Sequence, residues 1–271
     1  MNTPITYYGG KQRLADKIVS LMPEHRIYCE PYFGGGAVFF AKPKSYLEAI
    51  NDINDNLINF WKQLRDNYPQ LHKMINAYLH SESEHIRCKQ IYYNPTEYSE
   101  IERAYAFWVV TNFSVNATIH GGWKWDNGAS RSHIGITSRH KKERFVQELS
   151  DRLSDVQISC RDALKCISNR DTPDTLFYLD PPYLNADQKH YSGFKEEDMI
   201  QLLDVLTNLK GKFILSGYHA EILDTYIKKC GWQVMEIQVN CSAVHFNAKA
   251  VKKTELLITN YLYEEAERQP K

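Results

Sequence analysis

Residues 176–183 read Leu-Phe-Tyr-Leu-Asp-Pro-Pro-Tyr, an apolar run followed by a carboxylate, two prolines and an aromatic ring. The continuous apolar run is typical of a strand buried on both faces of a parallel sheet. Because Asp180 follows that strand directly, its carboxylate is expected to project over the open edge of the sheet. The prolines fix the backbone and remove N–H donors, which leaves carbonyl groups there to act as acceptors.

The other apolar runs alternate with helical patterns and predict an α/β fold. Leu14, Ile18 and Leu21 have helical spacing, and the strand that follows them ends at Glu30 before a run of glycines. We therefore expect a Rossmann-like sheet whose ligand site lies beyond the carboxyl ends of its strands. The further predicted strands are 27–30, 46–50, 156–160 and 212–216, with 232–240 and 254–261 pairing as an antiparallel edge hairpin.

Between residues 57 and 157 the pattern changes to helices without strands. One helix carries Leu57, Trp61 and Leu64, and another carries Leu71, Ile75 and Leu79 after Pro69. A third begins at the capping pair Ser99 and Glu102. We predict a helical insert at 57–157 within a catalytic domain formed by 1–56 and 158–271.

Composition sets outer bounds on the class of protein. The 271 residues carry 33 basic and 33 acidic side chains, so no global positive field exists to attract nucleic acid. The six cysteines form neither CxxC pairs nor clusters with histidine, and we expect neither a metal site nor a disulfide framework. No signal peptide or membrane-spanning run is apparent, so we expect a soluble, cytoplasmic protein. The tail 264–271 is expected to be disordered.

Asp180 and its neighbours suit the chemistry of an exocyclic amine. Such an amine has its lone pair delocalised into the base, and acceptors for its two N–H bonds can localise that pair for attack. Asp180 and the carbonyl of Pro181 would supply those acceptors, with Pro182 stiffening the turn and Tyr183 stacking on a base flipped from its duplex. The alternative interpretation is a rigid turn that simply ends the strand.

A second motif, Glu30-Pro-Tyr-Phe-Gly-Gly-Gly36, is a turn in which glycines let a cofactor approach the backbone. Asp52 lies 18 residues beyond Gly34 at the end of the next predicted strand, where a carboxylate can bind ribose hydroxyls. No phosphate-binding GxxxxGK[ST] loop occurs in the chain, which argues against an NTPase. A dinucleotide dehydrogenase would fit this motif alone, but would leave Asp180 unexplained.

Taken in order, these motifs resemble those of the Dam-type (alpha-group) adenine-N6 DNA methyltransferases over nearly the whole chain. Tyr7-Tyr-Gly-Gly-Lys11 is similar to the family's N-terminal cofactor motif, with Tyr7 where bacterial Dam proteins usually carry Trp. Residues 30–40 resemble its methionine-side loop, 51–54 its ribose-binding strand end, and 180–183 its catalytic tetrapeptide. Asp162 falls where the family places a carboxylate near the cofactor adenine. Residues 252–257 resemble the family's closing strand.

The resemblance implies an S-adenosyl-L-methionine (SAM) site and a catalytic tetrapeptide. The implied cofactor-binding residues are Tyr7, Lys11, Glu30, Phe33, Gly34, Asp52, Asp162 and Asp180, and the implied catalytic residues are Asp180, Pro181, Pro182 and Tyr183. Residues 112–125 resemble the base-reading segment and offer Asn116, His120 and Lys124 to DNA. Trp123 and Trp125 are either part of that surface or core residues of the insert.

The resulting hypothesis is a site-specific methyltransferase that moves a methyl group from SAM to N6 of a flipped adenine in DNA. Its expected partner is duplex DNA, the expected state is a monomer, and a cognate restriction enzyme is a further candidate partner. A basic stretch at 131–152, with six cationic and three anionic side chains, is a candidate for phosphate contacts. Alternatives left open are methylation of cytosine N4 or of RNA, a non-catalytic DNA-binding regulator, and methylation of a protein glutamine.

Overall fold

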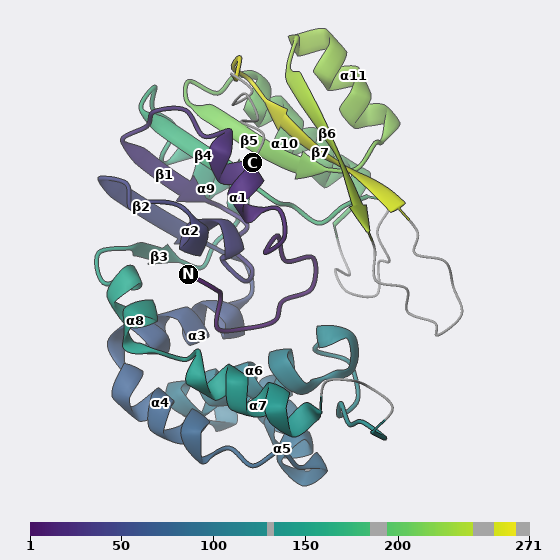
Figure 1. Cartoon of the computed structure of the whole chain (residues 1–271). Coiled ribbons are helices and arrows are strands. Elements are labelled where there is room, and N and C mark those ends of the chain that lie inside the picture. The colour runs from purple at the N-terminus through teal and green to yellow at the C-terminus, as the bar shows by residue number, and fades with distance from the viewer. Residues whose placement is uncertain (129–132, 185–193, 241–251, 264–271) are drawn as a thin grey trace, which may run out of the picture. The chain divides into compact units, whose positions relative to one another are not determined.

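The computed structural model describes residues 1–128, 133–184, 194–240 and 252–263 (Figure 1). Residues 241–251, between the two strands of the predicted hairpin, lie outside the described residues, as do the tail 264–271 and Arg131 of the basic stretch. The chain divides into two compact units. Unit 1 contains 1–16, 33–43 and 50–161, and unit 2 contains 17–32, 44–49 and 162–271.

Seven strands form one mixed sheet in the order β3-β2-β1-β4-β5-β7-β6. Strand β4 pairs in parallel with β1 and with β5, whereas β7 runs antiparallel to β5 and to β6. This arrangement confirms the predicted Rossmann-like α/β fold with an antiparallel C-terminal hairpin. The strands are β1 (Ile27–Glu30), β2 (Leu47–Asn51), β3 (Gln157–Ser159), β4 (Thr175–Leu179), β5 (Lys212–Gly217), β6 (Gln233–Asn240) and β7 (Lys252–Thr259).

The apolar run of β4 is buried on both faces, as predicted. Phe177 and Leu179 belong to a hydrophobic cluster that Phe213 and Leu215 of β5 extend in register. Because side chains alternate along a strand, Tyr178 points to the opposite face. That face is closed as well, since Tyr178 is buried and its hydroxyl lies 3.0 Å from Ser216 Oγ.

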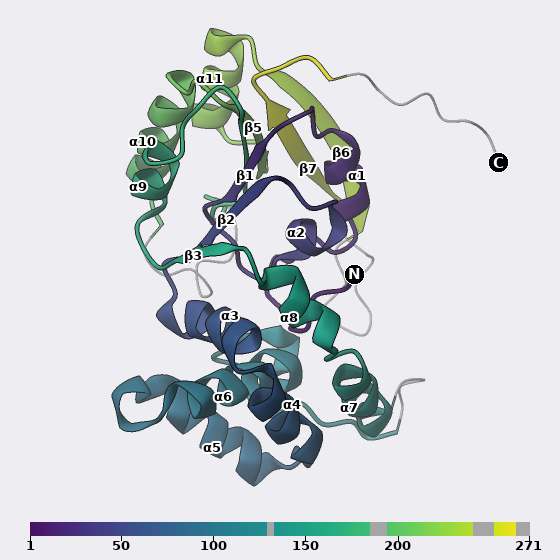
Figure 2. The ribbon, with the colours of Figure 1, turned by 90° about the vertical axis from the view of Figure 1, so that its left-hand side faces the viewer.

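Three helices of unit 2 cover the face with the cluster (Figure 2). They are α9 (Ala163–Ser168), α10 (Glu196–Thr207) and α11 (Glu221–Cys230). Helix α10 buries Leu202, Leu203 and Leu206, which recur at the spacing of one helix face. Each buried leucine removed from water stabilises the fold by about 1.5–3 kcal/mol, so this apolar face is enough to hold α10 against the sheet.

Unit 1 is mainly helical in its described residues. The predicted helices at 57 and 71 are confirmed, but Leu79 follows the end of its helix and is exposed, which corrects its assignment to that apolar face. Helix α5 was not predicted, because its buried face consists of His85, Cys88 and Ile91, with a single aliphatic side chain. The other helices in the described residues are α1 (Ala15–Ser20), α2 (Ala37–Ala41), α3 (Asp55–Asp66), α4 (Tyr68–Ala77), α5 (Glu82–Tyr93), α6 (Glu100–Phe113), α7 (Ile134–Glu143) and α8 (Gln147–Leu153), with short 3-10 turns at Pro95–Glu97 and Val115–Ala117.

Aromatic side chains form much of the core of unit 1. Trp61 of α3 is fully buried and packs against Phe33, Phe40 and Phe60 at centroid separations of 5.1, 5.6 and 5.0 Å. Its indole N–H donates to the carbonyl oxygen of Gly34 at 3.2 Å, which satisfies the one polar group of a buried tryptophan. The helical core is thereby tied to the glycine turn. No helix in the described parts of the chain is long and apolar enough to cross a membrane.

The predicted capping pair at the start of α6 gives a test of local structure. Glu102 accepts hydrogen bonds from the backbone N–H and hydroxyl of Ser99, and these bonds lower the pKa of its carboxyl group. A lowered pKa stabilises the fold above the pKa of the unfolded chain, and that stabilisation is lost as the pH falls through the folded value. The melting temperature of Glu102→Gln should therefore lie below wild type at neutral pH and converge with it in acid. A constant difference across pH would contradict this.

Candidate functional site

The glycine turn of unit 1 requires glycine for two physical reasons. Gly34 and Gly36 have φ values of +48° and +68°, in the left-handed region that side chains disfavour. A Cβ at Gly36 would also lie 2.6 Å from Phe33 Cζ, closer than atoms can approach. Glycine is therefore required by the shape of this turn, in which Gly34 is partly exposed while Gly35 and Gly36 are buried.

The predicted N-terminal motif lies against this turn. A Cβ at Gly34 would be 3.1 Å from Tyr7 Cδ1, and one at Gly35 would be 3.0 Å from Tyr7 Cβ, so the Tyr7 side chain contacts both glycines. The Thr3 hydroxyl donates to the carbonyl oxygen of Gly35. Lys11 is 8% exposed, and its ammonium donates to the Gly9 carbonyl at 2.9 Å. Two sequence-predicted cofactor residues, Tyr7 and Gly34, are thus in contact.

Asp52 holds the other side of the turn. Its Oδ2 accepts from the Gly34 backbone N–H at 3.0 Å, and its Oδ1 accepts from the Asn54 N–H at 3.0 Å. Burial raises the pKa of this carboxyl, and backbone N–H donors from Asn54, Gly34 and Ile53 oppose that rise. Since the two carboxylate oxygens offer about four acceptor positions, Asp52 can brace the turn and still accept from ribose hydroxyls.

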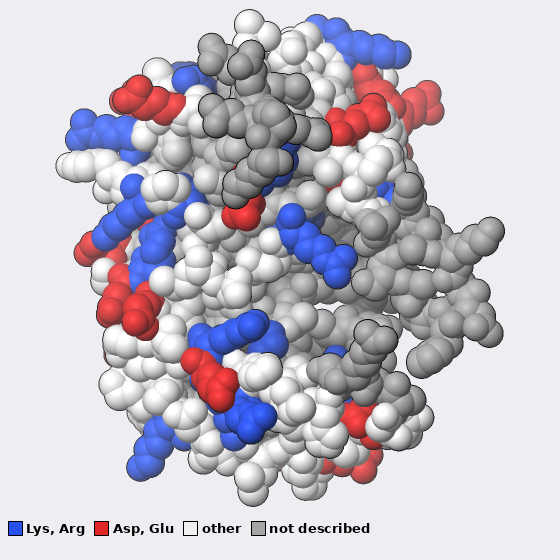
Figure 3. Space-filling model, viewed as in Figure 1, with Lys and Arg blue, Asp and Glu red and all other residues white. Residues whose placement is uncertain are grey.

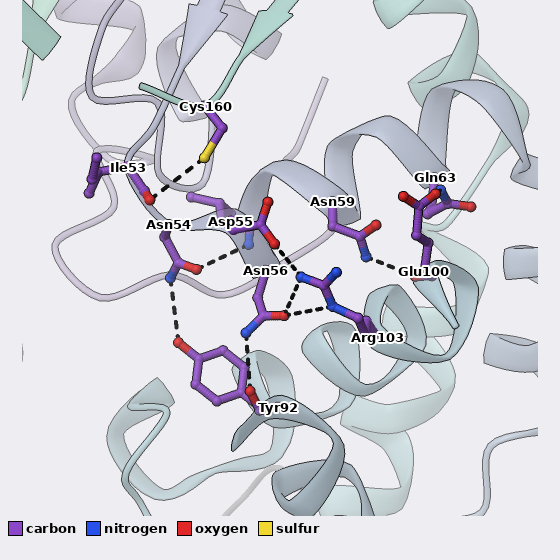
Figure 4. Close-up of polar contacts among 11 residues, drawn as sticks. Ile53, Asn54, Asp55, Asn56, Asn59, Gln63, Tyr92, Glu100, Arg103 and Cys160 are labelled. Atoms are coloured by element: carbon purple, nitrogen blue, oxygen red, sulfur yellow. Dashed lines mark hydrogen bonds and ion pairs between the residues drawn. The ribbon is translucent and has the colours of Figure 1, made fainter. Parts of the chain in front are cut away.

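The residues after Asp52 are fixed by the start of α3 (Figure 4). Asn54 Oδ1 accepts from Leu57 N at 3.3 Å and caps the helix. The side-chain amide of Asn56 donates to the Tyr92 carbonyl at 3.1 Å, and its oxygen accepts from Arg103 at 3.0–3.1 Å. Helices α5 and α6 therefore hold the segment that positions Asp52.

Asn112, near the end of α6, clamps the N-terminal segment and was not singled out from the sequence. It is 6% exposed, and its Oδ1 accepts from both the backbone N–H and the hydroxyl of Thr6 at 3.0 Å. Its amide donates to the carbonyls of Pro4 at 3.3 Å and Trp108 at 3.0 Å. Lys141 of α7 reaches the Thr6 hydroxyl at 2.7 Å. A buried asparagine inside an apolar helix was the available signal, because it must find partners.

Phe33 contributes to the turn from inside the core. Its ring is 2% exposed and packs edge-on against Phe39 and Trp61 at 5.5 and 5.1 Å. Its backbone N–H donates to the Asn51 carbonyl at 2.9 Å. The predicted cofactor role of Phe33 therefore has to come through the backbone rather than through the aromatic ring.

In unit 2, the Asp180–Tyr183 tetrapeptide folds back on itself. The Tyr183 hydroxyl donates to Asp180 Oδ1 at 2.9 Å and is also hydrogen-bonded to Glu255 Oε1. The ring of Tyr183 lies edge-on to Tyr218, with centroids 4.6 Å apart. Burial, followed by the neighbouring charges of Asp180 and Glu255, raises the pKa of Tyr183 well above its ordinary value, so the phenol keeps its proton at physiological pH.

Two further predicted cofactor residues have partners of their own in unit 2. Glu30 is 2% exposed, and its Oε2 accepts from the Tyr28 hydroxyl at 3.0 Å, while burial raises the pKa of Tyr28 well above its ordinary value. Asp162 is exposed and caps α9 by accepting from Lys165 N at 3.0 Å. Both residues have structural roles, and their roles toward a cofactor stay predictions.

The predicted base-reading segment, 112–125, begins within the last turn of α6, which ends at Phe113, and continues from Ser114 as a tight loop. Ser114 and Trp123 form an antiparallel bridge that closes it, and Asn116 takes a left-handed φ of 58°, which asparagine tolerates better than most residues. Asn116, His120 and Lys124 are all exposed. Trp125 is 64% exposed, which corrects the interpretation of it as a core residue, whereas Trp123 is half-buried against His80.

Within the described ranges, no group of three or more histidine, cysteine or acidic side chains could hold a metal ion.

Comparison with known proteins gives a family match over most of the chain. Residues 7–241 match the model of the D12 class N6 adenine-specific DNA methyltransferases. The chain is 27% identical to the type II methyltransferase M1.LlaDCHI of Lactococcus lactis, over 93% of each chain. It is 26% identical to M.FokI of Planomicrobium okeanokoites. That match covers 96% of this chain but 43% of the length of M.FokI. It is 30% identical to the DNA adenine methylase of Vibrio cholerae over 74% of each.

Because both carboxylate oxygens of Asp52 accept backbone hydrogen bonds, replacing the acid by an amide should weaken SAM binding. In Asp52→Asn one oxygen becomes an NH2 group that faces a backbone N–H, either of Gly34 or of Asn54. Loss of a charge-assisted hydrogen bond is worth about 1.5–3 kcal/mol, so we expect SAM affinity to fall by about tenfold or more in calorimetry. The exposed Asp16→Asn, also in unit 1, is the matched control and should bind as wild type. Wild-type affinity in Asp52→Asn would show that Asp52 does not support the cofactor site.

Proposed function

Because the chain belongs to the D12 class of N6 adenine-specific DNA methyltransferases, we propose that its Asp180–Tyr183 tetrapeptide holds the N6 amino group of a flipped adenine for methylation. The observation that carries this proposal is the hydrogen bond from Tyr183 to Asp180 at the carboxyl end of β4. It ties the aromatic ring and the carboxylate of the motif into one rigid group. Rigid placement matters because the reacting nitrogen must be held within a narrow geometry.

The methyl donor proposed for the reaction is SAM, which when bound supplies a methyl group already activated by its sulfonium. Unit 1 fits such a group, because Gly34 in the glycine turn is partly exposed and Asp52 beside it offers carboxylate oxygens. Tyr7 lies against the same turn and supplies an aromatic surface. On the family pattern we also propose cofactor contacts for Lys11 and Phe33 of unit 1 and for Glu30, Asp162 and Asp180 of unit 2.

The chain's own residues act mainly by orientation and hydrogen bonding. Asp180 and the Pro181 carbonyl accept the two N–H bonds of the amine and localise its lone pair on nitrogen. Tyr183 stacks on the base, which offsets part of an unstacking cost of roughly a few kcal/mol. In this role the Asp180 carboxylate also stabilises the transient positive charge on the nitrogen before its proton is lost.

DNA contacts are proposed for the reading loop and the basic side chains near it. Lys124, Arg139 and Arg144 are exposed, and Figure 3 shows Lys and Arg side chains over α7. Burial, and after it the positive charges of Arg144 and Lys124, lowers the pKa of Lys141 to about 8. Phosphate contacts from these residues would position the duplex while Asn116 and His120 meet base edges.

We further propose that residues 57–157 act as the target-recognition domain and that the enzyme works as a cytoplasmic monomer on duplex DNA. A cognate restriction enzyme is the second proposed partner. These assignments rest on the family pattern and on the exposure of the reading loop.

Removal of the catalytic carboxylate tests the proposed function. In single-turnover reactions at saturating SAM, Asp180→Ala should lose methyl transfer by about a thousandfold, since a preorganised electrostatic contact is removed. Asp174→Ala, an exposed carboxylate just before the start of β4, is the control and should react at the wild-type rate. Turnover in Asp180→Ala within a few-fold of wild type would overturn the assignment.

The proposed phosphate contacts predict a change in salt dependence. Each phosphate contact removed should reduce the slope of log binding constant against log salt by about one. We therefore expect Lys124→Gln and Arg144→Gln each to lower this slope in fluorescence anisotropy with duplex DNA. The exposed Lys228→Gln on α11 should leave it unchanged. Equal slopes in all variants would remove these residues from the DNA surface.

A further inference from the structure

The Tyr183 hydroxyl lies between two carboxylates, one of which has no place in the function described so far. It is hydrogen-bonded to Asp180 Oδ1 at 2.9 Å and to Glu255 Oε1. Glu255 is 3% exposed, so its carboxyl group is held inside unit 2 rather than at its surface. Burying an acidic side chain in a strand costs free energy unless hydrogen bonds compensate it, so this placement calls for a physical explanation.

The direction of β7 explains how Glu255 reaches the tetrapeptide. Leu256 pairs with Gly217, the last residue of β5, while Leu179 at the end of β4 pairs with Leu215. Since β7 is antiparallel to β5, the residue before Leu256 lies at the edge where the parallel strands end. Only a strand running in this reverse direction brings its N-terminal residues to that edge. The antiparallel strand thus delivers a carboxyl group to the site of Asp180.

The phenol couples the two carboxylates. A tyrosine hydroxyl carries one proton, so the two carboxylates at Asp180 and Glu255 compete for the same hydrogen-bond donor. The Tyr183 oxygen is therefore the atom through which Glu255 acts on Asp180. The Tyr183 ring is held separately by Tyr218, which follows β5 directly and over whose ring Lys253 Nζ lies at 5.3 Å.

We propose that Glu255 is a positioning residue, which fixes the Tyr183 hydroxyl and thereby the ring plane and the Asp180 carboxylate for the reaction. The inference rests on the proposed catalytic role of the tetrapeptide. Without Glu255 the tyrosine would keep its ring contact with Tyr218 but lose one of the two hydrogen bonds that orient its hydroxyl. A misplacement of about 1 Å in such a group can lower a rate by about a hundredfold.

A pair of variants of equal length separates hydrogen bonding from packing. Glu255→Gln keeps a polar group that can bond the tyrosine hydroxyl, whereas Glu255→Met fills the same space without one. We expect kcat to fall by about tenfold in Glu255→Met and to stay within about threefold of wild type in Glu255→Gln, with KM for DNA changed less than kcat. Glu48→Met, in a glutamate of β2 that is 2% exposed, controls for the burial of methionine and should retain the wild-type kcat.

A double-mutant cycle with Tyr183→Phe tests the route of the effect. If Glu255 acts through the hydroxyl, Tyr183→Phe alone should lose a similar factor, and Glu255→Met should then cost almost nothing further. An undiminished loss in the Tyr183→Phe background would overturn the inference, as would wild-type kcat in Glu255→Met. Should Glu255→Met fail to fold, a Glu255→Gln variant that loses kcat as strongly as Tyr183→Phe would overturn it too.

The inference and the proposed function fail in different ways. Loss of turnover in Asp180→Ala combined with wild-type kcat in Glu255→Met would overturn only the role of Glu255. Retained turnover in Asp180→Ala would overturn the role of the whole tetrapeptide. A tenfold loss in Glu255→Met that disappears in the Tyr183→Phe background supports both.

Discussion

The hydrogen bond between the Tyr183 hydroxyl and the Asp180 carboxylate depends on the fixed position of β4, the strand that precedes them. Strand β4 is buried along its whole length and paired in parallel on both sides, so the residues after Leu179 start from a fixed point. The prolines then restrict the backbone, and the tyrosine returns to bond the aspartate at 2.9 Å. A carboxylate held this way needs little reorganisation when an amine arrives, which is the condition for electrostatic catalysis.

In unit 1 the glycine turn is also held in a fixed position, but by different contacts. The glycine turn there has no side chains to hold it, so its shape depends on backbone hydrogen bonds to Asp52 and on the rings of Tyr7 and Trp61. The Tyr7 segment is in turn held through Thr6 by Asn112, which lies two residues before the reading loop begins at Ser114. Side chains assigned to DNA reading and to the cofactor are therefore linked within a single compact unit through a few buried polar contacts.

Local pattern predicted the central strands and the first helices of unit 1, but it did not predict α10, whose leucines recur on one helix face, or the contacts that depend on distant parts of the chain. The strands around Leu176 and Ile27 and the capping pair at Ser99 were read from periodicity and side-chain chemistry. Helix α5 was missed because a histidine and a cysteine occupy most of its buried face. The pairing of Glu255 with Tyr183 spans 72 residues and follows from strand direction, which no local pattern encodes. Trp125, too, could be placed on the surface only once the loop around it was known.

The most direct test of the account is the product of the reaction. Purified protein would be incubated with duplex DNA of mixed sequence and SAM carrying a labelled methyl group, and the DNA would then be digested to nucleosides and separated. The account predicts that the label is found in N6-methyladenine and that none is found in methylated cytosine. Label in N4-methylcytosine, or no label in DNA although SAM binds, would contradict it.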